Sequence, residues 1–191
     1  MKEISFTEGN WERYFQYAYT RRFPETPRFR QEADCIVNVR NGIRQNGCDF
    51  TSILLKETYE EGTTISFTAS FESYGAPLLL IAEDLEQDEA GVLRFGTYQE
   101  IVLWEHGVNV WDFRMEQGKV VFDWVLWNKF PLEANKPHKL TVRLGKKRLM
   151  GWVNDRYFEL FMPALTEKVW LGITACEGIN RFYDLQVDSN Q

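Results

Sequence analysis

The sequence has few of the features that mark membrane, metal-binding or nucleic-acid-binding proteins. No apolar run approaches the roughly 20 residues that a membrane-spanning helix needs. Its 191 residues include two histidines, too few for a multi-histidine metal site. The 22 basic residues are scattered and the net charge is −6, so the basic surface typical of a nucleic-acid-binding protein is missing. We therefore expect no nucleic acid, membrane or metal partner; the sequence does not indicate an oligomeric state.

Cysteine is also scarce. Cys35, Cys48 and Cys176 form no Cys-x-x-Cys pair, and their odd number fits a reducing compartment better than a disulfide scaffold. We expect all three to be buried thiols. Residues 1–6 lack the basic start and apolar run of a secretory signal. These features predict a cytoplasmic protein, or a secreted one if a leader has been removed.

Aromatic residues, in contrast, are abundant. The chain has 7 Trp, 8 Tyr and 14 Phe, together 15% of its residues. Such side chains favour β-strands and also bind flat apolar ligands.

From about residue 63 onward, apolar and polar residues alternate with the period of two that marks strands. Residues 65–71 carry one apolar and one polar face, whereas residues 78–82 are apolar on both faces, which is typical of a central strand. Residues 98–105, 108–115 and 119–127 repeat the strand signal around two glycine turns. This arrangement predicts a three-stranded meander.

The C-terminal third continues the pattern. Strands are predicted around residues 140–144, 149–153, 169–173 and 183–187, with a hairpin turn at Asn154-Asp155. Roughly nine to twelve short strands without a long helical period predict an all-β fold, an antiparallel two-sheet β-sandwich.

The chain length fits one domain, residues 1–191. Residues 1–33 are the part of that domain whose structure stays undecided. Apolar residues from Trp11 to Ala18 fall at helical spacing, while Pro24 and Pro27 indicate a loop. We expect this segment to pack on the sandwich as a short helix or an edge strand.

Four C-terminal segments carry a resemblance to a known family. They are Pro-His-Lys-Leu-Thr-Val-Arg at 137–143, Leu-Met-Gly-Trp-Val-Asn-Asp at 149–155, Val-Trp-Leu-Gly-Ile at 169–173 and Arg-Phe-Tyr-Asp-Leu-Gln-Val at 181–187. In this order they resemble the concanavalin A-like lectin and glucanase superfamily, in the branch that shares laminin G-type domains. The resemblance implies a jelly roll whose concave sheet face holds a saccharide. Its members include lectins, glycosidases, polysaccharide lyases and protein-binding modules, so it does not fix an activity.

Glycosidases of that superfamily carry Glu-x-Asp-x-Glu on one strand, and this chain lacks that motif. Its densest acidic stretch, residues 83–89, follows the central strand and is interpreted as a solvated loop. We expect no cofactor, with Ca²⁺ at this stretch as the alternative, because hard cations favour several carboxylate oxygens.

Three residues are candidates for catalysis: Glu100, His106 and Asp112. Glu100, Trp104 and His106 share a face if the strand persists to the turn, and a histidine beside a carboxylate can act as a general base. The structural alternative is a hydrogen-bonded histidine at a turn.

Candidate ligand-binding residues come from the meander. Saccharides offer apolar C–H patches to indole rings and hydroxyls to carboxylate, amide or guanidinium groups. The period of two places Trp111 and Asp112 on opposite faces of one strand. On the next strand it places Asp123 and Trp127 on one face and Trp124 on the other. We expect at least half of the tryptophans to belong to the core. The residues proposed to bind ligand are Trp104, Trp111, Asp112, Arg114, Trp124 and Trp127.

The segment 174–181 interrupts the strand pattern with small and polar residues. Loops on a rigid sheet often carry function, so Glu177 and Asn180 join the candidate binding residues. A hairpin connection with a glycine turn is the structural alternative.

Three hypotheses remain. The first is a non-catalytic, lectin-like module that binds an oligosaccharide or polysaccharide on a Trp-rich sheet face. The second is a glycan-processing hydrolase or lyase. The third is a protein-interaction domain whose exposed aromatic residues contact a partner.

Overall fold

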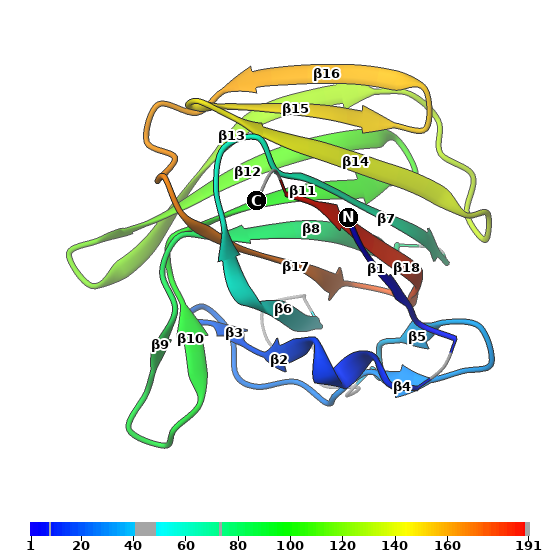
Figure 1. Cartoon of the computed structure of the whole chain (residues 1–191), viewed down its shortest axis with the longest axis horizontal. Coiled ribbons are helices and arrows are strands. Elements are labelled where there is room, and N and C mark those ends of the chain that lie inside the picture. The colour runs from blue at the N-terminus through cyan, green and yellow to red at the C-terminus, as the bar shows by residue number, and fades with distance from the viewer. Residues whose placement is uncertain (8, 41–48, 73, 190–191) are drawn as a thin grey trace.

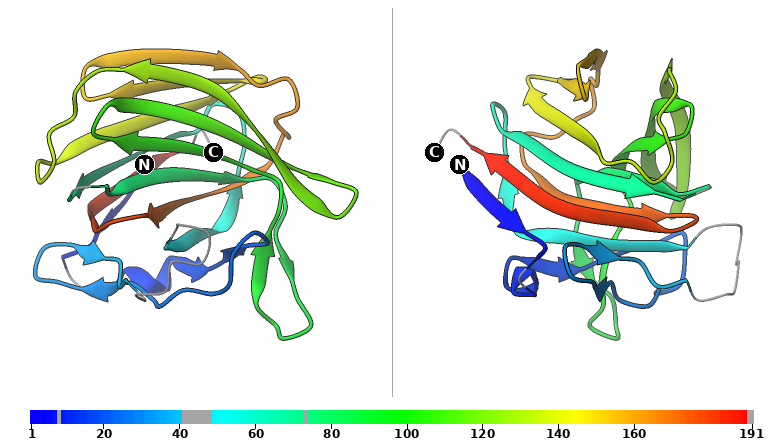
Figure 2. Two further views of the ribbon diagram at one scale, coloured as in Figure 1. Left: turned by 180° about the vertical axis from the view of Figure 1, so that it is seen from behind. Right: turned by 90° about the vertical axis from the view of Figure 1, so that its right-hand side faces the viewer.

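The computed structural model describes residues 1–7, 9–40, 49–72 and 74–189. Over these residues the chain folds into two large antiparallel sheets that pack face to face (Figure 1, Figure 2). The predicted all-β sandwich is confirmed. The described part contains no helix that is long and apolar enough to cross a membrane.

Sheet A has the strand order β16-β15-β14-β7-β18-β5-β4, and β1 also pairs with β18. Its strands are β1 (Lys2–Ser5), β4 (Arg30–Gln31), β5 (Ile36–Val37), β7 (Thr64–Phe71), β14 (His138–Gly145), β15 (Arg148–Val153), β16 (Arg156–Phe161) and β18 (Asn180–Asp188).

Sheet B has the order β13-β12-β11-β8-β17-β6-β2. Its strands are β2 (Phe15–Tyr17), β6 (Phe50–Tyr59), β8 (Ala76–Ala82), β11 (Tyr98–Trp104), β12 (Gly107–Glu116), β13 (Lys119–Lys129) and β17 (Val169–Cys176). A small sheet joins β3 (Tyr19–Thr20), β10 (Leu93–Phe95) and β9 (Glu86–Gln87), and a 3₁₀ helix spans Trp11–Arg13.

Period-two alternation builds the core between the two large sheets. The four apolar residues of the alternating run 65–71 are all buried there. In β8, Leu79 and Ile81 face the same core, whereas Leu78 and Leu80 belong to a second apolar cluster on the other side of sheet B. The prediction of a central strand that is covered on both faces is therefore confirmed.

The meander is found as β11, β12 and β13, and the four predicted C-terminal strands are found as β14, β15, β17 and β18. Strand β16 follows the predicted hairpin turn at Asn154-Asp155 but is not among the predicted strands. The first meander turn lies one residue earlier, at Glu105-His106, because Gly107 already begins β12. Gly107 has φ +126°, and a Cβ there would overlap the Asn128 carbonyl oxygen, so the position requires glycine. The N-terminal segment contains both alternatives, a short helix and the edge strand β2.

Strand β6 has no counterpart among the predicted strands. Its Thr51 and Ser52 are polar and yet fully buried, which conceals the alternation. Ser52 Oγ lies 2.8 Å from Thr174 Oγ1 on β17, and Thr51 Oγ1 lies 2.9 Å from Thr26 Oγ1. These hydrogen bonds offset the cost of burying the hydroxyls.

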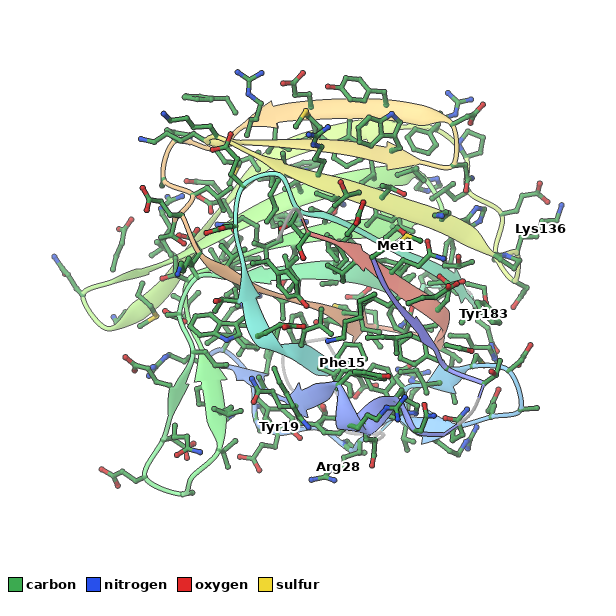
Figure 3. The ribbon with its side chains drawn as sticks, viewed as in Figure 1. Met1, Phe15, Tyr19, Arg28, Lys136 and Tyr183 are labelled. Atoms are coloured by element: carbon green, nitrogen blue, oxygen red, sulfur yellow. The ribbon has the colours of Figure 1, made fainter. Side chains whose placement is uncertain are left out.

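The outer face of sheet B, which points away from sheet A, is partly covered by residues 18–26, here called the strap. Phe23 in the strap packs on Phe50 of β6 with 5.7 Å between ring centroids. Thr26 Oγ1 donates a hydrogen bond of 3.1 Å to the Phe50 carbonyl oxygen. Tyr19 marks the start of the strap in Figure 3, along the lower side of the sandwich. The strap covers Tyr98 of β11 and Phe113 of β12 and leaves the rest of the face formed by β11, β12 and β13 open.

Candidate functional site

The open half of the outer face of sheet B holds a cavity of about 600 Å³. This volume is within the range of roughly 300–1,000 Å³ that is usual for small-molecule sites. Its floor is formed by outward-facing residues of β8, β11 and β12. Arg22 and Phe23 of the strap form one wall, and Tyr74 and Glu177, in the turns before β8 and after β17, form another.

Aromatic rings form a continuous ladder along this face. Each ring lies at a centroid distance typical of interacting aromatic pairs. The distances are 4.4 Å for Tyr98–Phe113, 5.5 Å for Phe113–Phe122, 5.9 Å for Phe122–Trp111, 5.5 Å for Trp111–Trp124, 4.4 Å for Trp124–Trp127 and 6.0 Å for Trp127–Trp104. The ladder presents indole faces and edges over the width of three strands.

A β-bulge places both tryptophans of the edge strand β13, Trp124 and Trp127, on the face that carries the ladder. The register between β12 and β13 shifts at Val110/Trp111, so that Trp111 pairs with Trp124 while Asn109 pairs with Trp127. Without the shift, residues 124 and 127 would point to opposite faces, as strict alternation predicts. The predicted separation of Trp124 from Trp127 is therefore wrong, and the extra residue of the bulge is the reason.

The four tryptophans of the site are not core residues. Trp124 is 46% exposed and Trp127 is 42% exposed, and Trp104 and Trp111 are half-buried. The expectation that at least half of them pack in the core is wrong, because Phe, Leu and Ile fill the space between the sheets. The buried Nε1 atom of Trp104 has no hydrogen-bond partner among the described residues.

Arg22 is a functional candidate that the sequence did not reveal. Its guanidinium lies 4.4 Å from the ring centroid of Phe113 and 4.7 Å from that of Phe23, within cation–π range. Nη1 donates to Tyr98 Oη at 3.2 Å and lies 3.8 Å from Glu100 Oε1. Burial raises the pKa of Tyr98, and the nearby Glu100 raises it further, so its hydroxyl stays neutral. Arg22 therefore places a fixed cation beside a buried carboxylate at the aromatic floor.

Glu100 is inside the cavity, whereas His106 is not. Glu100 lies on β11 with Tyr98 and Trp104 on the same face, and it is 6% exposed. His106 is exposed in the turn after β11, where it packs edge-on against Trp104 and lies 3.5 Å from Glu105. Four residues of strand, about 13 Å, separate Glu100 from Trp104. The structure thus does not join Glu100 and His106 as an acid–base pair.

Asp112 and Arg114 lie on the opposite face of sheet B. Asp112 Oδ1 accepts a hydrogen bond from Gln99 Nε2 at 3.0 Å, and Asp112 Oδ2 accepts one from Arg114 Nη1 at 2.5 Å. Arg114 also binds Asp123 at 2.5 Å, and these two carboxylates raise the pKa of Arg114. The structure separates these two candidates from the tryptophans because neighbouring residues of a strand point to opposite faces.

The two candidates of the β17–β18 turn have different positions. Glu177, with φ 54°, lines the rim of the cavity. Asn180 is fully buried, and its Nδ2 donates to the carbonyl oxygens of Glu177 at 2.7 Å and Cys176 at 3.3 Å. Its backbone N–H donates to Asn38 Oδ1 at 2.8 Å. Asn180 therefore holds the turn that carries Glu177 and does not reach the cavity.

The cysteines differ from the expectation at one position. Cys35 is buried, and burial raises the pKa of its thiol to about 12. Cys176 is half-buried and lines the cavity, so the prediction of a buried thiol is wrong there. The turn after β17 ends beside the open face, which leaves the end of this strand uncovered. Cys48 lies outside the described residues.

The acidic stretch 83–89 contains a strand, β9, which pairs with β10, so it is not simply a loop. Its carboxylates bind different parts of the chain. Asp84 accepts hydrogen bonds from the backbone N–H groups of Gly96 at 2.6 Å and Thr97 at 3.0 Å. Asp88 binds Arg94 at 3.0 Å. In the part of the chain that the structure describes, no group of three His, Cys, Asp or Glu side chains is placed to hold a metal ion.

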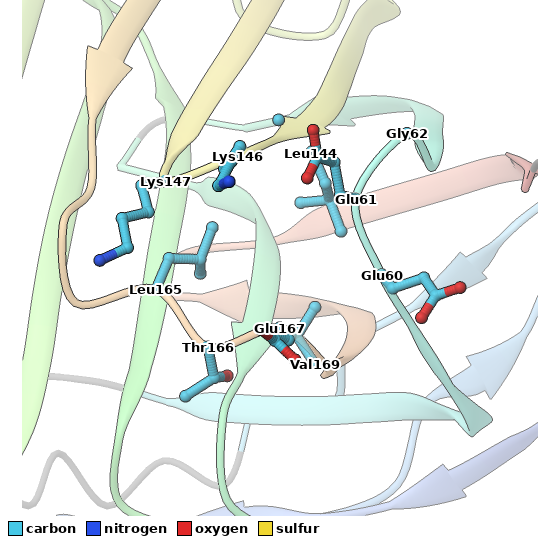
Figure 4. Close-up of a pocket in the computed structure, with 11 residues that line it drawn as sticks. Glu60, Glu61, Gly62, Leu144, Lys146, Lys147, Leu165, Thr166, Glu167 and Val169 are labelled. Atoms are coloured by element: carbon cyan, nitrogen blue, oxygen red, sulfur yellow. The ribbon is translucent and has the colours of Figure 1, made fainter.

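A second cavity, of about 630 Å³, lies where the turns at 60–62 and 145–147 meet the segment 165–169 (Figure 4). Its lining combines glutamates with Lys146 and Lys147 and contains no aromatic ring. Turn and loop residues form most of its walls, together with the last two residues of β14 and the first residue of β17. It lacks the flat apolar surface that distinguishes the cavity on sheet B.

No family model matches this chain, and no curated protein matches it. Similar solved structures exist at low sequence identity. The carbohydrate-binding module CBM66 from Bacillus subtilis is 13% identical and aligns over 84% of this chain and 91% of its own, with a TM-score of 0.60. A glycoside hydrolase family 16 endo-glucanase from Bacteroides ovatus is 8% identical and aligns over 98% and 99%, with a TM-score of 0.63.

A third similar structure is a protein of unknown function with a galectin-like fold from Bacillus subtilis. It is 10% identical, aligns over 99% of this chain and 95% of its own, and has a TM-score of 0.68. At such identities the likeness concerns the fold, since one fold of this kind hosts many activities. The chain has the concanavalin A-like jelly-roll fold that its C-terminal strands predicted.

Proposed function

We propose that the protein binds a saccharide in the cavity on the outer face of sheet B and does not cleave it. One observation carries the proposal: an aromatic ladder borders the half-buried Arg22 and its buried partner Glu100 in a cavity of suitable volume. Indole rings bind the apolar C–H faces of a sugar, and the ion pair binds its hydroxyls.

The fold neighbours agree with this choice of ligand. Among them are a carbohydrate-binding module and an endo-glucanase that was solved in complex with a saccharide-type ligand. A saccharide also suits a cavity that combines exposed rings with few charges.

Binding without cleavage is favoured by the outward-facing residues of β11. They are Tyr98, Glu100, Val102 and Trp104, a set with one carboxylate. Glycoside hydrolysis generally needs two carboxyl groups that are about 5 to 10 Å apart. Glu105 and Glu177 lie at the rim of the cavity, and Arg22 keeps a positive charge beside Glu100.

Titration with neutral and acidic oligosaccharides, followed by tryptophan fluorescence, tests the proposal. We expect a saturable change with at least one sugar class and intact sugar at the endpoint. Glu100→Gln should weaken binding about tenfold, since a hydrogen bond to a charged group contributes about 1.5–3 kcal/mol. Glu159→Gln, at an exposed position of β16 on sheet A, is the matched control and should bind normally.

Other outcomes would replace the proposal. Cleavage products that disappear in Glu100→Gln would identify a hydrolase or lyase. A flat titration with every sugar would leave the protein-interaction hypothesis.

A further inference from the structure

The outer face of sheet B is open on one half and closed on the other. On its closed half, Ser52 and Leu54 of β6, Leu80 of β8 and Thr174 of β17 are 0% exposed. On its open half, Phe122 is 54% exposed and Trp124 is 46% exposed. The cavity continues past β8 to Cys176 of β17 and Phe50 of β6. Phe23 packs on Phe50 there, so a ligand that enters from β13 and crosses the strands meets a barrier at that end.

The strap forms this barrier. Phe23 packs on Phe50, and Thr20 Oγ1 lies 3.1 Å from Tyr98 Oη, so the strap is fixed to both β6 and β11. Arg22 and Phe23 line a separate cavity on the far side as well, together with Arg21 and Arg94. The strap is thus a partition between two cavities.

We infer that the cavity binds the end of a glycan chain and excludes an internal stretch of it. This inference rests on the proposed function. The cavity extends over five strand spacings, from Phe122 of β13 to Phe50 of β6, about 24 Å. A terminal sugar would lie against Arg22, Glu100 and Phe23, and the following units would pass over Trp111 and Trp127 to solvent. A chain that continued in both directions would collide with the strap.

Calorimetric stoichiometry tests the inference. The probes are linear β-1,3-glucan and β-1,4-glucan, each as short oligosaccharides and as polymers fractionated by length. For the glycan that binds, we expect one bound protein molecule per glycan molecule, whatever the length of the glycan. A number of bound proteins that rises with chain length would overturn chain-end recognition and leave saccharide binding intact. No heat with any probe would overturn both.

A pair of neighbouring arginines tests the role of the strap. Arg22→Ala removes the guanidinium that faces the cavity and should weaken binding of short oligosaccharides about tenfold. Arg21→Ala is the control, because Arg21 binds Glu86 on the far side of the strap at 2.6 Å and should leave affinity unchanged. Equal affinities of Arg22→Ala and the wild type would overturn the assigned place of the terminal sugar. Thermal unfolding of both variants checks the fold, and Arg22→Gln replaces Arg22→Ala if the latter is unfolded.

Discussion

Replacing Trp111 by alanine is expected to weaken saccharide binding about 30-fold, which corresponds to about 2 kcal/mol. Trp111 occupies the middle of the aromatic ladder, stacked on Trp124 with an interplanar angle of 11°. Its Nε1 donates to Asn109 Oδ1 at 3.1 Å, which fixes the orientation of the ring before a ligand arrives. A rigid ring in the centre of a site contributes most because little conformational freedom is lost on binding. Isothermal titration calorimetry measures the change.

Trp152→Ala is the matched control for this measurement. Trp152 lies on β15 of sheet A, 5.2 Å from Tyr157, away from the cavity. It should keep wild-type affinity. Unchanged affinity in Trp111→Ala would contradict the assigned site, and a lost thermal transition would mean that Trp111 supports the fold. If Trp111→Ala does not fold, the affinity of Trp124→Ala tests the site instead, because Trp124 is 46% exposed and its removal should leave the protein folded.

The largest expected effect on stability comes from adding a single methyl group, in Gly172→Ala. Gly172 is on β17 in the middle of sheet B, paired with Leu80 on one side and Leu54 on the other. A Cβ there would overlap the Ile53 carbonyl oxygen and lie 2.9 Å from Leu54 Cα. Backbone atoms on a paired strand cannot move aside without breaking the ladder. We expect the free energy of unfolding to fall by about 3 kcal/mol and the melting temperature by about 6–12 °C.

Gly145→Ala is the control, measured in the same thermal and denaturant unfolding experiments. A Cβ at this end of β14 would meet side-chain atoms of Arg148 and Met150, which can move. Gly145→Ala should lower the free energy of unfolding by less than about 1 kcal/mol. If Gly172→Ala and Gly145→Ala lowered the free energy of unfolding equally, the close approach of β17 to β6 at Gly172 would be contradicted.

The strands of the sandwich were predictable because their burial follows a local period. Residues 65–71 alternate in the sequence and in the structure, and residues 78–82 are apolar on both faces and covered on both faces. Strand β6 was not predictable in this way, because its buried hydroxyls are satisfied by Thr174 and Thr26, far away in the sequence. Local pattern does not reveal such partners.

The site was predictable in part. Aromatic density in the meander correctly marked Trp104, Trp111, Trp124 and Trp127 as residues of one neighbourhood. The face of each residue beyond the bulge was not predictable, since one extra residue reverses the alternation. The contribution of Arg22 depends on the path of the strap, and no spacing between residue 22 and β11 or β12 encodes that path.

The position of β18 determines when the molecule can fold. This strand, residues 180–188, lies between β7 on one side and β5 and β1 on the other, with Lys2 opposite Val187. Sheet A therefore lacks an inner strand until residues 180–188 have been made. Sheet A cannot be completed before that point, and pairings of such long sequence separation are slow, on the order of milliseconds to seconds. During that interval the apolar edges of β7 and β5 are exposed, so newly made chains are most prone to aggregate before β18 docks.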